Sequence, residues 1–496
     1  MPAGAFQLGL TAFPETFLFS NPQITFYKQV YKRHTNFAVE PISQFFNVKP
    51  DFGSRVTCTI SKIADLIGKI YLVVNLPPIG KFIDFPGEEG QGNSNIASCA
   101  WCNKIGWNII KQVELEIGGN IIERQYGDWL NIYSELTTPI SKRRGLNKMI
   151  GNIPEIYENT NGKKGYLLYI PLMFWFCRNY NMALPIIALD NSDIKINVEF
   201  NQLDDCLILS PSHYIIIEED IVNFKKGEII KQEYQNNIFY GRFNYFDVIN
   251  KRLYYTKITP EQFIPNINII SINNKYSITP IENEKLYLDK NRYFSHIINL
   301  SLNNAYLLVD MIYLDITERI NFAKKEHLYL IDYVQFDNDK LVYHSNNKIK
   351  LGYKNPVKEL IIRANYDYLL KGYSKESFNY TNSPYELEGE NIIKRASILL
   401  NGQERVKEKN FNYYEYIQNF QNHIVYNNIG INTYSFSIKP ESISPTGTCN
   451  FSNCDDIVIN LTIDKGVSYQ RPVKIKVYAL TYNMLKISNG LAKILF

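Results

Sequence analysis

Alternation of apolar and polar residues recurs along the whole chain, and it restricts the chain to a fold made mainly of β-strands. Clear examples lie at residues 56–60, 113–117, 194–200, 457–463 and 473–477. Successive side chains of a strand point to opposite faces, so this pattern predicts strands that are buried on one face. Turn-forming pairs such as Gly118-Gly119 and Asn401-Gly402 separate them, as antiparallel hairpins require. The sequence therefore predicts an all-β architecture.

Three of these features occur twice in the same order, which predicts an internal duplication. They are a strand with a glycine turn and a charged return strand, a second strand, and a closing strand, found at 115–124, 193–198 and 307–314, and again at 398–405, 456–461 and 473–480. Each set spans enough residues for one β-barrel, and 496 residues allow two sizeable cores. We therefore expect two similar barrels in tandem.

The duplication sets the expected domain bounds. The first barrel covers residues 36–316 and the second covers 334–496, with a linker at 317–333 that begins as a short polar helix. The first half is too long for one barrel, because roughly a hundred extra residues lie at about 201–305, and a structureless loop of that length is unusual in a compact domain. This insertion is expected to carry strands of its own.

Residues 1–35 are expected to form an N-terminal arm with a short amphipathic helix over 21–32. Asn21 is a good N-cap, Pro22 suits the first helical position, and apolar residues follow at spacings of three and four. At the other end, the tail at 487–496 is more apolar than a free terminus usually is, which favours packing on a neighbour.

A basic cluster lies in and directly after the last turns of the expected helix and is the first candidate contact site. It consists of Lys28, Lys32, Arg33 and His34. These residues are suited to an acidic partner or a membrane headgroup, but a solvated helix end is the favoured interpretation. The whole chain is nearly balanced, with 53 basic and 49 acidic residues and a net charge of +4. That balance argues against specific nucleic-acid binding, so any such contact would be local.

No arrangement in the sequence favours catalysis, and neither a cofactor nor a metal is expected. The six histidines form no metal-binding motif, and the Cys99–Cys102 pair has dithiol spacing without the setting of a redox site, which favours ordinary thiols. Glu114 and Glu116 alternate on one strand and are expected on its solvent face. No apolar run is long enough to span a bilayer.

Four N-glycosylation sequons are present, at Asn299, Asn379, Asn450 and Asn460. Asn460 falls inside an expected strand, so Asn299, Asn379 and Asn450 are the candidate sites. The four tryptophans are candidate anchors for cores or subunit contacts, with core packing favoured; they are Trp101, Trp107, Trp129 and Trp175.

Residues 21–38 closely resemble the N-terminal signature of the major capsid proteins of nucleocytoplasmic large DNA viruses, the double jelly-roll family. Similar stretches follow in family order at 113–120, 171–176, 183–189, 355–360, 400–405, 434–436 and 445–452. The segment at 315–323 looks like the family's inter-barrel segment, whereas 201–305 has no clear counterpart in its shorter members.

This resemblance implies two eight-stranded jelly rolls per subunit and a homotrimer that forms a pseudo-hexagonal capsomer beside neighbouring capsomers in an icosahedral shell. It implies that Lys28, Lys32, Arg33 and His34 lie on the inner face, near minor capsid proteins and an internal viral membrane. The expected location is the virion capsid, with assembly in the host cytoplasm.

Two other interpretations stay open. A minor or vertex-associated paralogue would have the same barrels, since abundance leaves no trace in sequence. A carbohydrate-binding or carbohydrate-active β-sandwich would need a convergent cluster of acids or a histidine-based site, which the sequence does not offer.

Overall fold

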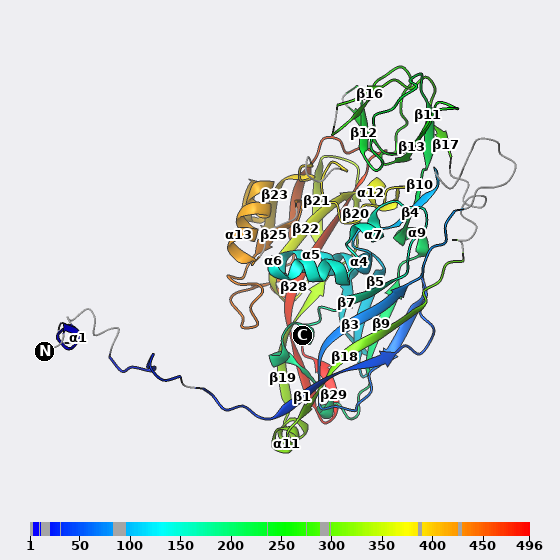
Figure 1. Ribbon diagram of the computed structural model, residues 1–496. Coiled ribbons are helices and arrows are strands. Elements are labelled where there is room, and N and C mark those ends of the chain that lie inside the picture. Colours follow the sequence, from blue (N-terminus) through cyan, green and yellow to red (C-terminus); the bar gives the residue numbers. More distant parts are fainter. Residues whose placement is uncertain are drawn as a thin grey trace.

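The computed structural model describes residues 3–8, 10, 20–29, 31–82, 96–235, 237–273, 275–287, 297, 299–384, 389–424 and 429–496. In this part of the chain the strands form two pairs of packed sheets, one pair in each half, a separate sheet at one end of the molecule and a two-stranded sheet (Figure 1). The prediction of an all-β architecture is confirmed.

The first half packs two antiparallel sheets around one core. The first sheet has the order β1-β18-β3-β7, where the strands are β1 (Phe37–Phe45), β18 (Asn304–Leu314), β3 (Leu66–Leu76) and β7 (Tyr166–Pro171). The second has the order β2-β9-β5-β6, with β2 (Arg55–Thr59), β9 (Ile194–Phe200), β5 (Ile110–Ile117) and β6 (Asn120–Tyr126). Alternate side chains such as Leu72 of β3 and Ile196 of β9 share the core, as strand periodicity requires.

The second half repeats this arrangement. Its first sheet has the order β19-β28-β22-β25, where the strands are β19 (His327–Gln335), β28 (Val473–Ser488), β22 (Pro356–Tyr366) and β25 (Asn432–Ser435). Its second has the order β21-β27-β23-β24, with β21 (Asn346–Leu351), β27 (Ile457–Ile463), β23 (Ile393–Leu400) and β24 (Gln403–Asn410). Short strands β20 (Lys340–Val342), β26 (Cys449–Asn450) and β29 (Leu491–Ile494) extend the first sheet.

The internal repeat is confirmed by these orders, because the repeated features take matching places. The hairpins β5–β6 and β23–β24 each lie beside the second repeated strand, which is β9 in one half and β27 in the other. The closing strands β18 and β28 are each second in their sheet. The repeat seen in the sequence is therefore a repeat of structure.

The long segment in the first half carries strands of its own, as predicted. It forms a sheet in the order β16-β15-β12-β13-β14-β11-β17 around a small separate core that includes Ile230, Leu253 and Tyr255. Its strands are β11 (His213–Ile216), β12 (Ile229–Tyr234), β13 (Asn237–Asp247), β14 (Arg252–Lys257), β15 (Ile269–Ser271), β16 (Ser277–Ile278) and β17 (Lys285–Leu286). Before it, β10 (Leu207–Ser210) pairs with β4 (Ser98–Trp101).

Helices fill the edges and junctions. In the first half they are α4 (Ile105–Asn108), α5 (Gly127–Thr137), α6 (Ile140–Met149), α7 (Pro154–Tyr157), α8 (Trp175–Arg178) and α9 (Leu203–Cys206). A predicted polar helix at the junction of the halves is present as α11 (Ile316–Lys324), and β19 begins at His327, inside the segment expected to be the linker. In the second half lie α12 (Asp367–Lys371), a π-helical turn η5 (Tyr413–Ile417) and α13 (Gln418–Asn422).

The C-terminal tail packs in part within its own chain, while Leu495 and Phe496 at its end are exposed, so packing on a neighbour stays a prediction. The chain turns at Asn489 and Gly490, and β29 then pairs back onto β28. Ile487 and Ala492 belong to the core of the first half, and the Ser192 hydroxyl donates to the Gly490 carbonyl at 3.0 Å. The apolar character of the tail therefore serves the contact between the two halves.

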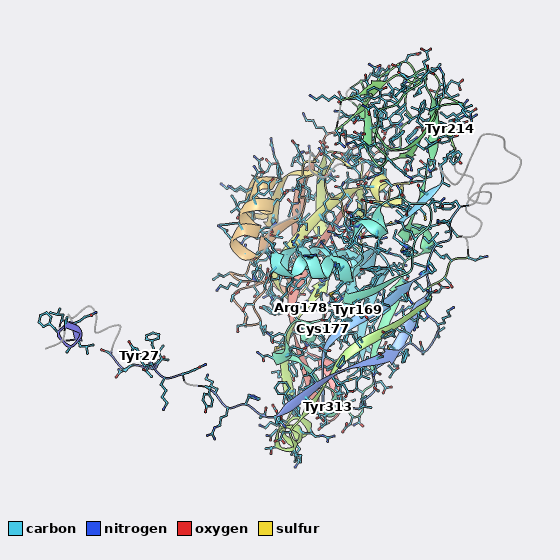
Figure 2. The ribbon with its side chains drawn as sticks, viewed as in Figure 1. Tyr27, Tyr169, Cys177, Arg178, Tyr214 and Tyr313 are labelled. Carbon is cyan, nitrogen blue, oxygen red and sulfur yellow. The ribbon has the colours of Figure 1, made fainter. Side chains whose placement is uncertain are left out.

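The helix expected over 21–32 is absent from the described residues of that segment, which are extended or turned, and a different short helix, α1 (Ala3–Leu8), precedes it. The arm runs out from the body of the chain, and Tyr27 is 99% exposed (Figure 2). An amphipathic helix this short needs a surface against which to bury its apolar face, and the described part of the arm contacts none.

Gly127 marks the tight junction between β6 and α5. A Cβ at this position would lie 2.1 Å from the carbonyl oxygen of Trp107 and 2.4 Å from that of Ile110. Both are backbone atoms, so relief would require a shift of the chain that enters α5. Gly145 in α6 offers a contrast, since nothing lies within 4 Å of the point that a Cβ would occupy there.

We expect Gly127→Ala to lower the free energy of unfolding by about 1–3 kcal/mol or more, because the added methyl overpacks the junction. The matched variant Gly145→Ala should instead gain about 1 kcal/mol from better helix propensity. Chemical denaturation of both variants measures the difference. Equal stabilities for the two would contradict the close approach at Gly127.

Candidate functional site

The contact between the two halves is the most elaborate site in the described chain. Helix α5 leaves the first half and lies on the outer face of the second half's first sheet (Figure 1). Trp129, Ile132 and Leu136 follow one another at spacings of three and four, so they form one helical stripe. All three are buried against a cluster that includes Ile361 of β22 and Tyr478 of β28. We call this contact the seam.

An acidic residue beside the stripe holds three partners from the second half. The carboxylate of Asp128 pairs with Arg363, lies 2.9 Å from Lys476 Nζ and accepts a hydrogen bond from the Tyr478 hydroxyl at 3.0 Å. Burial, together with the nearby charge of Arg363, lowers the pKa of Lys476 to about 7. Because Arg363 is only 2% exposed, its charge depends on Asp128 for compensation.

A second ionic group lies further along the seam. Arg178 Nη1 is 2.7 Å from Asp332 Oδ2, and Lys358 Nζ is 3.3 Å from the same oxygen. Burial opposes the charge of Asp332, but these two cations hold its pKa below the ordinary value. Nearby Glu123 is buried, and burial raises its pKa to about 8, so it is largely protonated at neutral pH.

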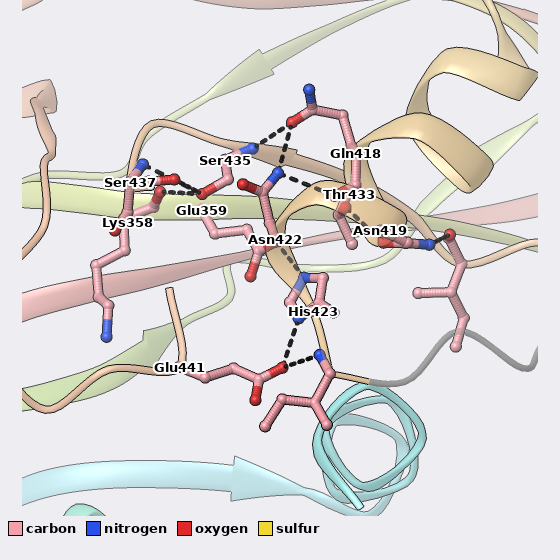
Figure 3. A network of polar contacts seen from close by, with 12 residues as sticks. Lys358, Glu359, Gln418, Asn419, Asn422, His423, Thr433, Ser435, Ser437 and Glu441 are labelled. Carbon is pink, nitrogen blue, oxygen red and sulfur yellow. Dashed lines mark hydrogen bonds and ion pairs between the residues drawn. The ribbon is translucent and has the colours of Figure 1, made fainter. Parts of the chain in front are cut away.

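His423 lies directly after α13, between two carboxylates (Figure 3). Its Nε2 is 2.7 Å from Glu359 Oε1, and its Nδ1 is 3.0 Å from Glu441 Oε1. Burial alone would lower the pKa of His423, but attraction to Glu359 and hydrogen bonds to both carboxylates raise it to about 10. The imidazolium therefore ties α13 to β22 and to the loop that carries Glu441.

Lys28, Lys32, Arg33 and His34, the predicted contact residues, are all exposed on the extended arm. They follow one another on this segment, and His34 Nδ1 bonds to the backbone carbonyl of its neighbour Thr35 at 2.7 Å. Exposed apolar side chains accompany them, since Phe26 is 90% exposed. The arm thus presents alternating aromatic and basic groups outside the body of the chain.

The three candidate glycosylation residues differ in access. Asn299 and Asn450 are exposed, whereas Asn379 is 2% exposed and both polar ends of its amide are engaged. Its Nδ2 donates to the Ser383 carbonyl at 2.8 Å, and its Oδ1 accepts from the Thr381 amide at 2.9 Å. A glycan on Asn379 would break this turn, so of the three candidates the folded chain offers only Asn299 and Asn450.

The predicted solvent exposure of Glu114 was wrong. Its side chain is 2% exposed and lies between Arg55 and Arg124, whose guanidinium groups are 2.5 and 2.7 Å away. The strand pattern placed it on the outer face correctly, but these two long side chains from neighbouring strands cover it. Glu116 is partly exposed and pairs with Lys195 at 3.7 Å. These carboxylates are structural ion-pair partners.

Cys99 and Cys102 are buried, and burial raises the pKa of their thiols to about 11 and about 12. Thiols with such pKa values stay protonated and unreactive at neutral pH. Across the described residues no group of three or more histidine, cysteine or acidic side chains is placed to hold a metal; His296 lies outside them. Nor is any described helix long and apolar enough to cross a membrane.

All four tryptophans are buried, which agrees with the prediction that they pack in cores. Trp101, Trp107 and Trp175 fill the core of the first half, and Trp129 fills the seam. Sequence reasoning named Trp129 but missed the seam and its ion pair of Asp128 with Arg363. It also missed the contact of His423 with two carboxylates within the second half. The helical stripe in 129–136 was a readable signal, whereas nothing local in the sequence pairs Asp128 with residues more than two hundred positions away.

Comparisons with known proteins agree along the whole chain. Residues 25–247 match the family model described as major capsid protein N-terminus, and residues 318–493 match the one described as large eukaryotic DNA virus major capsid protein. The chain is 37% identical to probable capsid protein 4 of Acanthamoeba polyphaga mimivirus, over 100% of this chain and 99% of the relative. It is 30% identical to the major capsid protein of Phaeocystis pouchetii virus, over 99% of each.

Solved structures show the same fold. The capsid of the virus PBCV-1, a quasi-atomic model, superposes with a TM-score of 0.63 at 22% identity, covering 95% of this chain and 100% of that one. The Faustovirus major capsid protein superposes with a TM-score of 0.66 at 12% identity, covering 96% of this chain and 94% of that one.

We expect Asp128→Ala to lower the free energy of unfolding by about 3–5 kcal/mol, because it leaves the buried Arg363 without its carboxylate. Asp456→Ala is the matched control: its partner Lys350 is largely exposed, so losing that pair should change the stability little. Denaturant titrations of both variants provide the comparison. A small loss for Asp128→Ala would mean that the seam does not depend on this group.

The histidine contact predicts a pH-dependent stability. The folded pKa of His423, about 10, lies above its unfolded value near 6.5, so its contribution is complete below pH 6.5 and is lost as pH rises toward 10. The stability advantage of the wild type over His423→Gln should therefore shrink by on the order of 4 kcal/mol across that window. Urea titrations at several pH values measure it, with the exposed His34→Gln as control. A constant difference would contradict the raised pKa.

Proposed function

The chain belongs to the major capsid protein family of large eukaryotic DNA viruses, and on that premise we propose how it builds a viral shell. It is a structural capsid protein of the virion. The observation that carries this function is the relationship to capsid proteins over the full length of both chains, from the arm to the C-terminal strands. Its family implies a structural rather than a catalytic role.

The subunit consists of two eight-stranded jelly rolls in tandem. The proposed bounds are an arm at 1–35, a first barrel at 36–316 with an insertion at about 201–305, and a linker that was expected at 317–333 but ends at 326. The second barrel then covers 327–496, because β19 begins at His327. Support comes from the principal sheet orders, which contain four strands in each of the four packed sheets of the described chain. Two stiff β-sandwiches joined by a buried seam make a rigid block that suits a shell.

Three such chains form a homotrimer in which six barrels make a pseudo-hexagonal capsomer. The near-equivalence of the two halves supports this arrangement, because three copies of a two-barrel chain present six similar blocks around one axis. Neighbouring capsomers then tile the shell. Light scattering on the purified chain tests the trimer, and a stable monomer at micromolar concentration would contradict it.

The arm faces the inside of the shell. It leaves the body at the end where α11 and β1 lie, and the insertion β11–β17 lies at the opposite end (Figure 1). The exposed groups Lys28, Lys32, Arg33 and His34 are suited to an acidic surface, either minor capsid proteins or the headgroups of an internal membrane. The insertion then faces outward. Assembly takes place in the host cytoplasm.

Deleting residues 1–35 should leave the trimer intact, because the described residues of the arm are exposed and the ring contact of His34 with Phe37 is local. It should impair assembly of the shell, because the basic cluster is lost with the arm. The measurement pairs light scattering of the truncated chain with electron microscopy of particles formed in infected cells. A milder variant, Lys28→Glu with Lys32→Glu and Arg33→Glu, keeps the arm and reverses its charge. Normal particles from both variants would overturn the inner-face role.

Abundance separates the main coat subunit from a minor or vertex-associated paralogue with the same barrels. Quantitative mass spectrometry of purified virions gives the copy number directly. The main coat protein should be the most abundant capsid polypeptide, whereas a vertex protein should be scarce relative to it.

A further inference from the structure

Each half carries a helix directly after its charged hairpin, and the two helices stand at the same place in the repeat. In the first half the hairpin β5–β6 leads into α5; in the second, β23–β24 leads into η5 and α13. Helical backbone begins at Gly127 in the first half and at Phe411, two residues before η5, in the second, so Leu130 and Tyr414 are each the fourth residue of their helical segment. Each is buried in the core of its own half. The two segments are therefore structural equivalents.

On each helix, the side chains that point away from the core of their own half follow the same spacing of three and four residues. They are buried on the first helix and mostly exposed on the second. On α5, Trp129, Ile132 and Leu136 are buried in the seam. The matching positions of the second repeat hold Tyr413, Tyr416 and Phe420. Tyr413 is half-buried, while Tyr416 is 42% and Phe420 86% exposed. A stripe that the first repeat uses for docking thus faces solvent in the second.

The receiving surface is repeated as well. Within the chain, α5 lies on the outer face of β19-β28-β22-β25. The equivalent outer face in the first half belongs to β1-β18-β3-β7, where register pairs Tyr306 with Val73 and Val73 with Tyr169. Around them lie the partly or fully exposed apolar side chains Phe45, Tyr71, Leu167 and Leu308. This face carries the kind of aromatic surface that α5 finds on the second half.

We propose that the face of η5 and α13 bearing Tyr416 and Phe420 docks on the outer face of β1-β18-β3-β7 in a second copy of the chain. The contact continues between chains the interface that the seam makes within one chain. It is heterologous, because a helix of one copy meets a sheet of the next, and such contacts generate a closed ring when the rotation closes. The inference rests on the proposed trimer and names the surface that forms it.

The two contacts differ in their charges. Where α5 has Asp128, the second residue of its helical segment, the second repeat has Asn412. The ionic group that pairs Asp128 with Arg363 and Lys476 therefore has no counterpart on this helix. Association between copies then depends mainly on apolar burial, so raising the salt concentration from low to high should leave it largely unchanged.

Replacing Phe420 tests the helix side of the contact. Phe420→Asp should convert the oligomer to monomer in light scattering, with unfolding unchanged from the wild type. Ile249→Asp, at an 81% exposed position on the insertion, is the matched control and should keep the wild-type mass. A trimeric wild type with an equally trimeric Phe420→Asp variant would overturn the contact and leave the proposed trimer standing. A monomeric wild type would overturn both.

Mixing two variants tests the pairing itself. Tyr169→Asp should also be monomeric, because it damages the sheet side of the contact. In a one-to-one mixture, the intact helix face of Tyr169→Asp meets the intact sheet face of Phe420→Asp, so one sound contact forms per pair. The expected product is a heterodimer that cannot close into a ring. A mixture that stays monomeric would show that these two faces are not partners and would overturn the proposal.

Discussion

The burial of α5 between the two halves is the constraint on which the rest of the structure depends. Trp129, Ile132 and Leu136 each gain about 2 kcal/mol or more from burial, but only when the second half lies in one position. Asp128 restricts the position of the second half further, because only in this position does its carboxylate compensate the charge of the buried Arg363. Strand β28 adds a covalent element, because Ile475 belongs to the second core and Ile487 to the first. The two barrels therefore behave as one rigid block.

The seam also explains why two similar halves have different surfaces. The outer sheet face of the second half and the helix stripe of the first half bury each other within one chain. What remains exposed is the complementary set, namely the stripe with Phe420 and the sheet face with Tyr169. When the helix of one repeat docks on the sheet of the other, each of these two surfaces is buried in one repeat and exposed in the other. A further copy of the chain can therefore bind in the same orientation, helix to sheet.

The sequence was sufficient for features that depend on local pattern. Period two located β5, β9, β27 and β28, because one buried face imposes that alternation. The glycine turns located the hairpins β5–β6 and β23–β24. The sequence was not sufficient for features that depend on groups far apart along the chain. Residues 21–32 have helical periodicity, yet no surface in the described chain covers their apolar face. Glu114 sits on the expected face of its strand, yet Arg55 and Arg124 bury it. The ions of the seam join positions far apart in sequence, which no local pattern encodes.

The edge strands show how such a subunit limits its contacts to side-chain faces. In the first half β6 packs beside β19 across the seam, so it is covered. Its equivalent β24 is exposed, and it carries Glu404, Lys407 and Glu408 along its length. Charged side chains on an edge oppose the addition of a foreign strand, and Pro41 on the edge strand β1 removes a donor there. Open-ended strand pairing would compete with a closed ring; charges and proline on the edges suppress it and leave the helix and sheet faces as the surfaces through which copies meet.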